Sequence, residues 1–142
     1  MLPEVVLIPL ALFTLLIASY TDLKTREVPD WLNYALLFSA FGIRIIFSLE
    51  FGWPILLSGI LGFGVCFSLA YLFYQTDQWG GGDSKLLMAM GAIIGITYPL
   101  TSSSLNILWY ILALLFLGSI YGVIWMLYLA LTKRALFWPK WQ

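Results

Sequence analysis

Five long apolar segments dominate this sequence of 142 residues and constrain its fold more than any other feature. They cover about residues 2–20, 31–49, 53–74, 84–100 and 105–132. A helix needs about 20 predominantly apolar residues to cross the hydrocarbon core of a bilayer. The sequence therefore predicts an all-α, polytopic bundle with five transmembrane helices.

The composition excludes a soluble fold. Hydrophobic residues make up 62% of the chain and charged residues 10%, whereas a typical soluble domain carries roughly 25% charged residues. A soluble fold of this length leaves about a third of its surface in contact with water, which so apolar a chain does not tolerate. Because five spans use about 100 residues, we expect one membrane-embedded domain over residues 1–142, with no room for a separate soluble domain.

The basic residues between the segments predict the orientation in the membrane. If the chain crosses five times, one side carries Lys24, Arg26, Lys85, Lys133, Arg134 and Lys140. Cytoplasmic loops are enriched in Lys and Arg, so this side is predicted to be the cytoplasm, with the N-terminus outside and the C-terminus inside. The remaining basic residue, Arg44, lies late in the second segment, and we expect its side chain to reach toward the outer interface.

Missing residue types narrow the chemistry that the chain can support. It contains no His, which excludes Ser-His-Asp triads, Cys-His pairs and imidazole metal sites. Cys66 is the single Cys and lies in an apolar run, so neither a CxxC zinc site nor an internal disulfide can form. A net charge of zero gives no indication of a nucleic-acid partner. We expect no metal and no cofactor, and a chemistry of carboxylates, lysines and hydroxyls.

Two carboxylates have special settings at the predicted cytoplasmic face. Asp22 directly follows the first apolar segment, and Asp83 follows the glycines Gly80, Gly81 and Gly82, which allow a sharp turn or a close backbone approach. Two carboxylates brought close together cannot both ionise easily, so one keeps its proton and their pKa values separate. An aspartic protease uses such a pair, in which one carboxylate takes a proton from water and the other gives one to the scissile carbonyl.

Simpler interpretations exist for most of these charged residues. Asp83 and Asp30 can each cap the N-terminus of the following helix, and for Asp30 we prefer this interpretation. Lys85 lies two positions after Asp83, on nearly the opposite helix face, where it can contact lipid phosphate or substrate or simply anchor the interface. Arg26 can bind substrate or serve as an ordinary cytoplasmic charge. Asp77 is a rival second carboxylate that lacks the glycine setting.

Two motifs resemble those of a known family. The stretch DLKTREVPDWL from Asp22 to Leu32 closely resembles the first aspartate motif of type IV prepilin peptidases. The stretch GGGDSKLL from Gly80 to Leu87 resembles their GxGD motif, including its downstream lysine. Archaeal preflagellin peptidases share this plan, and presenilin-type proteases share the GxGD element more distantly. Together the motifs cover about half of the chain, from Asp22 to about Gly95.

The resemblance implies an activity and a location. Such enzymes cut a short basic leader from prepilin-like or archaellin-like precursors, on the cytoplasmic side of the cell membrane and just before the hydrophobic helix of the precursor. By position, Asp22 and Asp83 would form the catalytic pair, and the turn of Gly80, Gly81 and Gly82 would present Asp83. The expected partners are such a precursor and membrane lipid.

The sequence also departs from the family pattern. Many bacterial members carry a cytoplasmic region with paired CxxC zinc motifs and also methylate the new N-terminus, so this chain resembles a form with peptidase activity alone. Members usually have about six spans, which would require a break within residues 105–132. Two other functions stay open: a small bundle that conducts protons or cations, which should place acids at mid-depth, and an inactive assembly subunit of a pilus or secretion machine.

Overall fold

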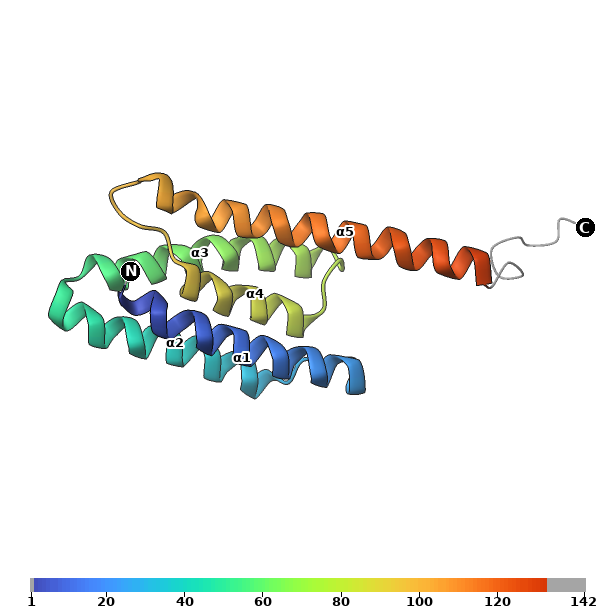
Figure 1. The fold of residues 1–142 in the computed structure, drawn as a ribbon, viewed down its shortest axis with the longest axis horizontal. Helices are drawn as coiled ribbons and strands as arrows, with labels where there is room; N and C mark the ends of the chain where they lie inside the picture. Colours follow the sequence, from blue (N-terminus) through green and yellow to red (C-terminus); the bar gives the residue numbers. More distant parts are fainter. Residues whose placement is uncertain (1, 133–142) are drawn as a thin grey trace, which may run out of the picture. The chain divides into compact units, whose positions relative to one another are not determined.

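The computed structural model describes residues 2–132, which form α-helices, one short 3₁₀ turn and no strand. The elements are α1 (Leu2–Thr25), α2 (Asp30–Phe51), α3 (Pro54–Gln75), α4 (Gly81–Ile94), η1 (Ser102–Leu105) and α5 (Asn106–Thr132) (Figure 1). This confirms the predicted all-α class. The chain divides into two compact units, residues 1–107 and 108–142, so α1–α4 lie in the first and nearly all of α5 in the second.

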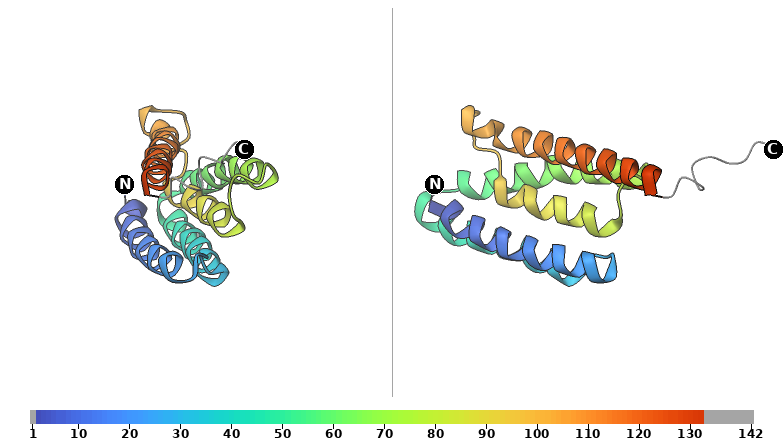
Figure 2. Two further views of the ribbon diagram at one scale, coloured as in Figure 1. Left: turned by 90° about the vertical axis from the view of Figure 1, so that its right-hand side faces the viewer. Right: turned by 45° about the vertical axis from the view of Figure 1, so that its right-hand side comes forward.

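Helices α1–α4 run alternately up and down the first unit (Figure 1). The end of α1, the start of α2, the end of α3 and the start of α4 therefore lie at the same end of the bundle. Helix α4 packs against α1, α2 and α3, most extensively against α3, and the end-on view in Figure 2 shows it beside α2 and α3. The shortest helix is thus the centre of the unit.

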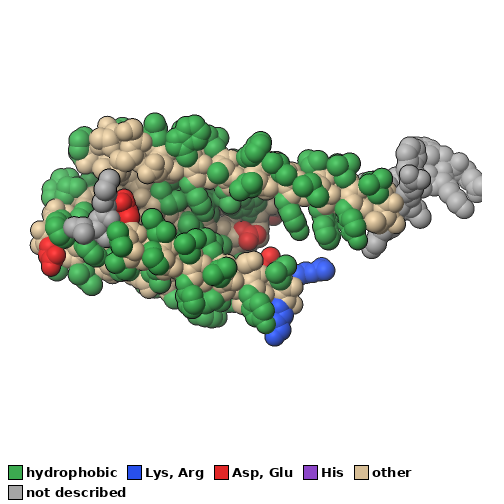
Figure 3. Space-filling model, in the orientation of Figure 1, with side chains coloured by type: hydrophobic (Ala, Val, Ile, Leu, Met, Phe, Trp, Pro, Cys, Tyr) green, Lys and Arg blue, Asp and Glu red, His purple; other side chains and the backbone are tan. Residues whose placement is uncertain are grey.

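Four helical segments are long and apolar enough to cross a membrane, judged by length and composition in the described part of the chain. They are Pro3–Thr25, Asp30–Phe51, Pro54–Gln75 and Ser102–Thr132. Large hydrophobic side chains are exposed on all four, as expected for lipid contact, and green hydrophobic side chains are spread along the helices in Figure 3. The structure supports a multi-pass membrane protein.

The predicted span at residues 84–100 is not among these four, because α4 has only 14 residues and ends at Ile94. Gly95 ends the helix with φ +69°, a conformation that favours glycine. The next residue then leaves the helix, and the backbone N–H of Ile96 donates to the carbonyl of Ser58 at 2.9 Å. Helix α4 also begins earlier than predicted, at Gly81, so that Asp83 lies in its first turn and is not a cap.

Small residues let α3 and α4 approach closely at Gly62 and Gly91. A Cβ atom added to Gly91 would lie 2.5 Å from the carbonyl oxygen of Gly62 and 2.6 Å from Cβ of Cys66. A Cβ on Gly62 would in turn overlap the carbonyl of Gly91. The two backbones are therefore in direct contact.

A Cβ atom added to Gly118 or Gly122 of α5 would meet no described atom within 4 Å outside its own stretch of helix. Helix α5 runs without a break over its 27 residues, so the described structure contains no division of this segment into two spans. Three of the basic residues used to predict the orientation, Lys133, Arg134 and Lys140, lie outside the described residues.

Arg44 lies inside the bundle, which corrects the expectation that it reaches toward the outer interface. It is 3% exposed. Its guanidinium donates hydrogen bonds to the carbonyls of Ala92 and Ile93, both at 2.7 Å. It also donates to the carbonyl of Ile55 at 3.0 Å and to Ser58 Oγ at 3.3 Å. Because α4 stops inside the bundle, its last carbonyls lack helical partners, and Arg44 supplies the donors and a favourable charge.

Candidate active site

Asp22 lies in the last turn of α1, which continues past the apolar segment to Thr25. Arg26 then ends the helix with φ +58°, while its backbone N–H donates to the carbonyl of Asp22 at 2.7 Å. This left-handed residue turns the chain into the short connection to α2. The Asp22 side chain is exposed and lines a cleft at this end of the bundle.

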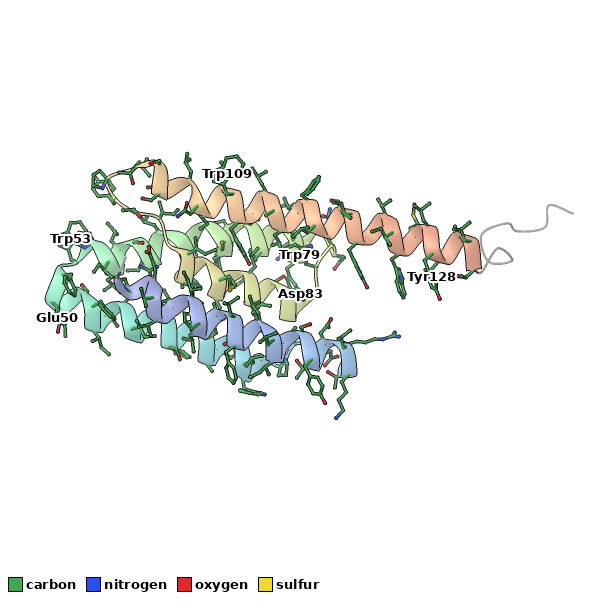
Figure 4. The ribbon with its side chains drawn as sticks, viewed as in Figure 1. Glu50, Trp53, Trp79, Asp83, Trp109 and Tyr128 are labelled. Carbon is green, nitrogen blue, oxygen red and sulfur yellow. The ribbon has the colours of Figure 1, made fainter. Side chains whose placement is uncertain are left out.

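The connection from α3 to the start of α4, residues 76–80, leads to Asp83. The backbone N–H groups of Gln78 and Trp79 donate to the carbonyl of Phe73 at 3.1 and 3.3 Å, and the rings of Phe73 and Trp79 pack with their centroids 4.9 Å apart. The chain then enters α4 with Gly80 as the N-cap residue. Figure 4 shows Asp83 at the start of α4, at the opposite end of the bundle from the labelled Glu50 and Trp53.

Only one of the three glycines is required by close packing. A Cβ on Gly82 would lie 3.1 Å from the carbonyl oxygen of Val28 and 3.3 Å from its Cβ, so a side chain there would displace the α1–α2 connection. The nearest atom to a Cβ on Gly81 is 3.8 Å away, and that to a Cβ on Gly80 is 3.7 Å away, which are ordinary contact distances. The nearest atom to Gly80 is Oδ2 of Asp83.

Asp22 and Asp83 lie where two clefts meet. A polar cleft of about 440 Å³ is lined by the α1–α2 connection, the glycine turn and both aspartates. A second, open cleft of about 270 Å³ runs between α1 and α4, where Leu15, Ala18 and Leu86 line it together with the same two aspartates. The predicted pair of carboxylates is therefore brought together, with a polar surface on one side and a largely apolar surface on the other.

The two carboxyl groups interact electrostatically. Asp83 is open to its cleft, yet the surrounding protein partly desolvates its carboxyl group, and this raises its pKa above the ordinary value for Asp. The negative charge of Asp22 raises the pKa of Asp83 further. Asp83 therefore keeps its proton to a higher pH than an ordinary aspartate does.

Lys85 of α4 forms an ion pair with Asp30 of α2. Lys85 Nζ lies 2.6 Å from Asp30 Oδ1 and 5.6 Å from the centre of the Tyr34 ring. The hydrogen bond to Asp30 raises the pKa of Lys85. Asp30 does not cap α2, because Pro29 occupies the N-cap position and Asp30 is the first helical residue. The expectation that Asp30 caps α2 is therefore wrong, and Asp30 pairs with a residue of α4 instead.

The other predicted candidates have less specific surroundings. Arg26 is exposed and lines the polar cleft with Lys85. Asp77 is exposed, with φ +53°, and lines neither of the two clefts that contain the aspartate pair. Within residues 2–132, no cluster of three or more His, Cys, Asp or Glu side chains could hold a metal ion.

One residue near the site was missed in the sequence. Asn33 of α2 is 1% exposed, and its Nδ2 donates to the carbonyl of Gly82 at 3.1 Å. In the sequence, Asn33 could have been recognised as a polar amide on the helix face that buries Leu32, Leu36 and Ala40.

The fold and the site together define a helical, multi-pass membrane protein with two interacting carboxylates at one end of its bundle. Residues 9–127 match the sequence profile of the type IV leader peptidase family. Because this match covers most of the chain, the protein belongs to that family.

Curated relatives agree with this assignment. The chain is 37% identical to a preflagellin peptidase of Methanococcus voltae over 97 residues, which are 66% of this chain and 41% of that protein. It is 36% identical to a preflagellin peptidase of Methanocaldococcus jannaschii over 85 residues, or 56% of this chain and 34% of that protein. The chain thus spans well under half the length of these relatives. No solved structure matches it.

Proposed function

We propose that this protein is a membrane aspartic endopeptidase that removes the leader peptide from prepilin-like or preflagellin-like precursors. Asp22 and Asp83 are the catalytic pair. The observation that carries the proposal is the meeting of these two side chains at one cleft, with the pKa of Asp83 raised partly by the charge of Asp22. Membership of the type IV leader peptidase family supports the choice of substrate.

The raised pKa of Asp83 favours the role of proton donor for this residue. Ionised Asp22 takes a proton from a water molecule, whose oxygen attacks the carbonyl carbon of the scissile peptide bond. Asp83, whose pKa is raised above the ordinary value for Asp, gives its proton to the carbonyl oxygen. When the tetrahedral intermediate breaks, the C–N bond is cleaved and the proton held by Asp22 passes to the leaving amine.

The two clefts suggest how a precursor lies across the pair. The polar cleft, with Glu27 and Asp30 among its lining residues, accepts the leader peptide. The cleft between α1 and α4, with Leu15 and Leu86, accepts the start of the hydrophobic helix of the precursor. The scissile bond, which joins these two parts of the substrate, then lies at the aspartates where the clefts meet.

The active site faces the cytoplasm in this proposal. Lys24, Arg26 and Lys85 all lie at the end of the bundle that carries the aspartates. In Figure 3, the basic side chains that show on this face project from the end at which α1 finishes. An excess of Lys and Arg is typical of the cytoplasmic side of a membrane protein.

Cleavage of a precursor in membranes tests the catalytic pair. Asp22→Asn and Asp83→Asn should each lower the cleavage rate by about 100-fold or more, because each removes one proton-transfer group while keeping its shape. Asp77→Asn is the matched control, since Asp77 is an exposed aspartate at the same end of the bundle and outside both clefts. Near-wild-type cleavage by either of the first two variants would refute the assignment.

The same variants separate peptidase activity from ion conduction. A conducting bundle should carry acids at mid-depth, and the charged side chain in the interior of the described helices is instead Arg44. Purified protein in liposomes should show no proton or cation flux above that of empty liposomes. A flux that Asp22→Asn and Asp83→Asn both abolish would favour the conducting bundle.

A further inference from the structure

Asn33 is an unusual residue for its position. It lies one turn into α2, between Leu32 and Leu36 of the buried face, and is 1% exposed. Its Nδ2 has one partner, the carbonyl of Gly82, while its Oδ1 is buried and has no hydrogen-bond partner in the described structure. A buried amide group with an unpaired atom costs free energy. A leucine of similar size would avoid that cost, so packing alone does not explain the asparagine.

The partner of Asn33 explains its placement. Gly82 immediately precedes Asp83, so the carbonyl that Asn33 binds belongs to the peptide unit that carries the Asp83 backbone. Rotation of this peptide unit would swing the Asp83 side chain toward or away from Asp22. The hydrogen bond links α2 to this peptide across 49 positions of sequence.

Two further contacts come from the same short stretch of chain. Val28 packs so closely against Gly82 that a Cβ atom there would have to displace it slightly. Asp30 holds Lys85, which follows Asp83 by two positions, with an Nζ–Oδ1 distance of 2.6 Å. Contacts from residues 28–33 therefore fix the chain on both sides of Asp83, whose own carboxyl group makes no hydrogen bond or ion pair with another described residue.

We propose that Asn33 is a positioning residue for Asp83: its hydrogen bond to the carbonyl of Gly82 fixes the orientation of the Asp83 carboxyl group relative to Asp22, and the ion pair of Asp30 with Lys85 supports the same geometry. Asn33 lines neither of the two clefts at the aspartate pair and so acts through the backbone and not on the substrate. This proposal rests on the proposed function, because it gives Asp83 a catalytic role. Its central claim about geometry is also testable without any catalysis.

The first test is kinetic. Asn33→Leu keeps the size of the side chain and removes the donor, and it should lower kcat by about 10- to 100-fold, because a small displacement of a catalytic group has effects of that order. KM should change little, since Asn33 is not expected to touch the precursor. Asn106→Leu makes the same substitution at the exposed first residue of α5 and should leave both constants unchanged. An unchanged kcat in Asn33→Leu, or a change in KM alone, would refute the positioning role.

The second test measures geometry directly. In a Cys66→Ser background, Asp22→Cys and Asp83→Cys together provide the only two thiols of the chain, and a short bifunctional thiol reagent reports how readily these positions meet. Adding Asn33→Leu should slow cross-linking several-fold, whereas adding Asn106→Leu should not. An unchanged cross-linking rate would overturn the proposal even if kcat fell, because the fall would then come from another cause.

The ion pair offers a test by restoration. Asp30→Lys and Lys85→Asp should each lower kcat, because each places two like charges together. The double variant restores an ion pair with reversed polarity and should recover part of the loss. If kcat of the double variant is no higher than that of the less active single variant, the ion pair does not support the geometry of Asp83. The role of Asn33 is then decided by the kinetic and cross-linking tests alone.

The outcomes distinguish the two proposals. If Asp22→Asn and Asp83→Asn cleave normally, the proposed function fails, and the cross-linking experiment still decides whether Asn33 orients the chain at Asp83. If those two variants are inactive while Asn33→Leu cleaves and cross-links like the wild type, the proposed function stands and the positioning role fails. Native stability of Asn33→Leu, measured by the accessibility of Cys66 in the otherwise unmodified chain, excludes simple misfolding.

Discussion

Replacement of Arg44 should loosen the packing of α4 against α3. The Arg44 guanidinium donates four hydrogen bonds, two of them to the last carbonyls of α4 and two to the first turns of α3, at Ile55 and Ser58. In Arg44→Leu these acceptors lose a charged donor, and the carbonyls of Ala92 and Ile93 stay buried. Because Leu fills only part of the space and brings no polar atom, nothing replaces the lost bonds.

The expected loss follows from the number and kind of these bonds. A hydrogen bond to a charged group contributes about 1.5–3 kcal/mol, so four would sum to about 6–12 kcal/mol without other terms. Relief of the desolvation of Arg44 offsets much of this, and removal of one partner from a buried charged network costs about 3–5 kcal/mol in practice. We expect at least about 3 kcal/mol, which corresponds to a more than 100-fold rise in the opened population, because 1.4 kcal/mol is tenfold.

Cys66 provides the assay. It is the only cysteine in the sequence, is 0% exposed, and lies on α3 against Gly91 of α4. A maleimide can reach its thiol only when the two helices separate, so the labelling rate in detergent reports the opened population. Arg44→Leu should label more than about 100 times faster than the wild type.

Two further variants make the measurement specific. Arg44→Lys keeps the charge but presents all its donors from one nitrogen, which cannot span the carbonyls of both helices, so its labelling rate should be intermediate. Lys24→Leu removes an exposed basic residue at the end of α1 and should label like the wild type. If Arg44→Leu labels within about twofold of the wild type, the hydrogen bonds of Arg44 do not hold α4 against α3, and the reasoning is refuted.

Two other outcomes follow from the packing and the charges. Gly62→Ala should speed Cys66 labelling, because its Cβ would overlap the Gly91 carbonyl and overpacking costs about 1–3 kcal/mol. Gly64→Ala is the control, because Gly64 has open space around it. Equal labelling rates in the two variants would contradict the close contact of α3 and α4. The pKa of Asp83 is raised, so cleavage should decline, and the fold should lose some stability, as the pH rises through that pKa. Asp22→Asn removes a negative charge that raises the pKa of Asp83. The infrared band of protonated Asp83 should therefore vanish at lower pH in this variant than in the wild type. An unchanged titration of that band would show that the two carboxyl groups do not interact.

The long helices were predictable because hydrophobic length is a strong and local signal. Helices α2 and α3 begin and end within two residues of their predicted spans. Asp22 and Asp83 were also recognisable, since each stands at a helix end beside a feature that can be read from neighbouring residues. These predictions required no knowledge of which helices touch.

The missed features all depend on contacts between distant parts of the chain. Residues 84–100 look like one apolar segment, and only the packing of α3 against α4 shows that Gly95 ends the helix there. Arg44 looked like an interfacial residue because the carbonyls that it binds lie 48 and 49 positions away. Asp30 looked like a cap for the same reason, because its partner Lys85 lies on another helix.

These long-range contacts share one arrangement, in which α2 holds both ends of α4. At the end that carries Asp83, α2 contributes Asn33 and Asp30. At the other end it contributes Arg44. A 14-residue helix held at both ends by a 22-residue helix, and packed along its length against α3, has little freedom to move by itself.

Helix α1 is placed differently. Of the three helices that contact α4, α1 packs against it least extensively, and an open cleft runs between them beside the aspartate pair. Because Asn33 and Asp30 of α2 hold the chain on either side of Asp83, we expect any change in the separation of Asp22 and Asp83 to come from displacement of α1. A precursor helix that enters this cleft would contact both α1 and α4, so substrate binding and the approach of the two carboxyl groups would be coupled through the same surface.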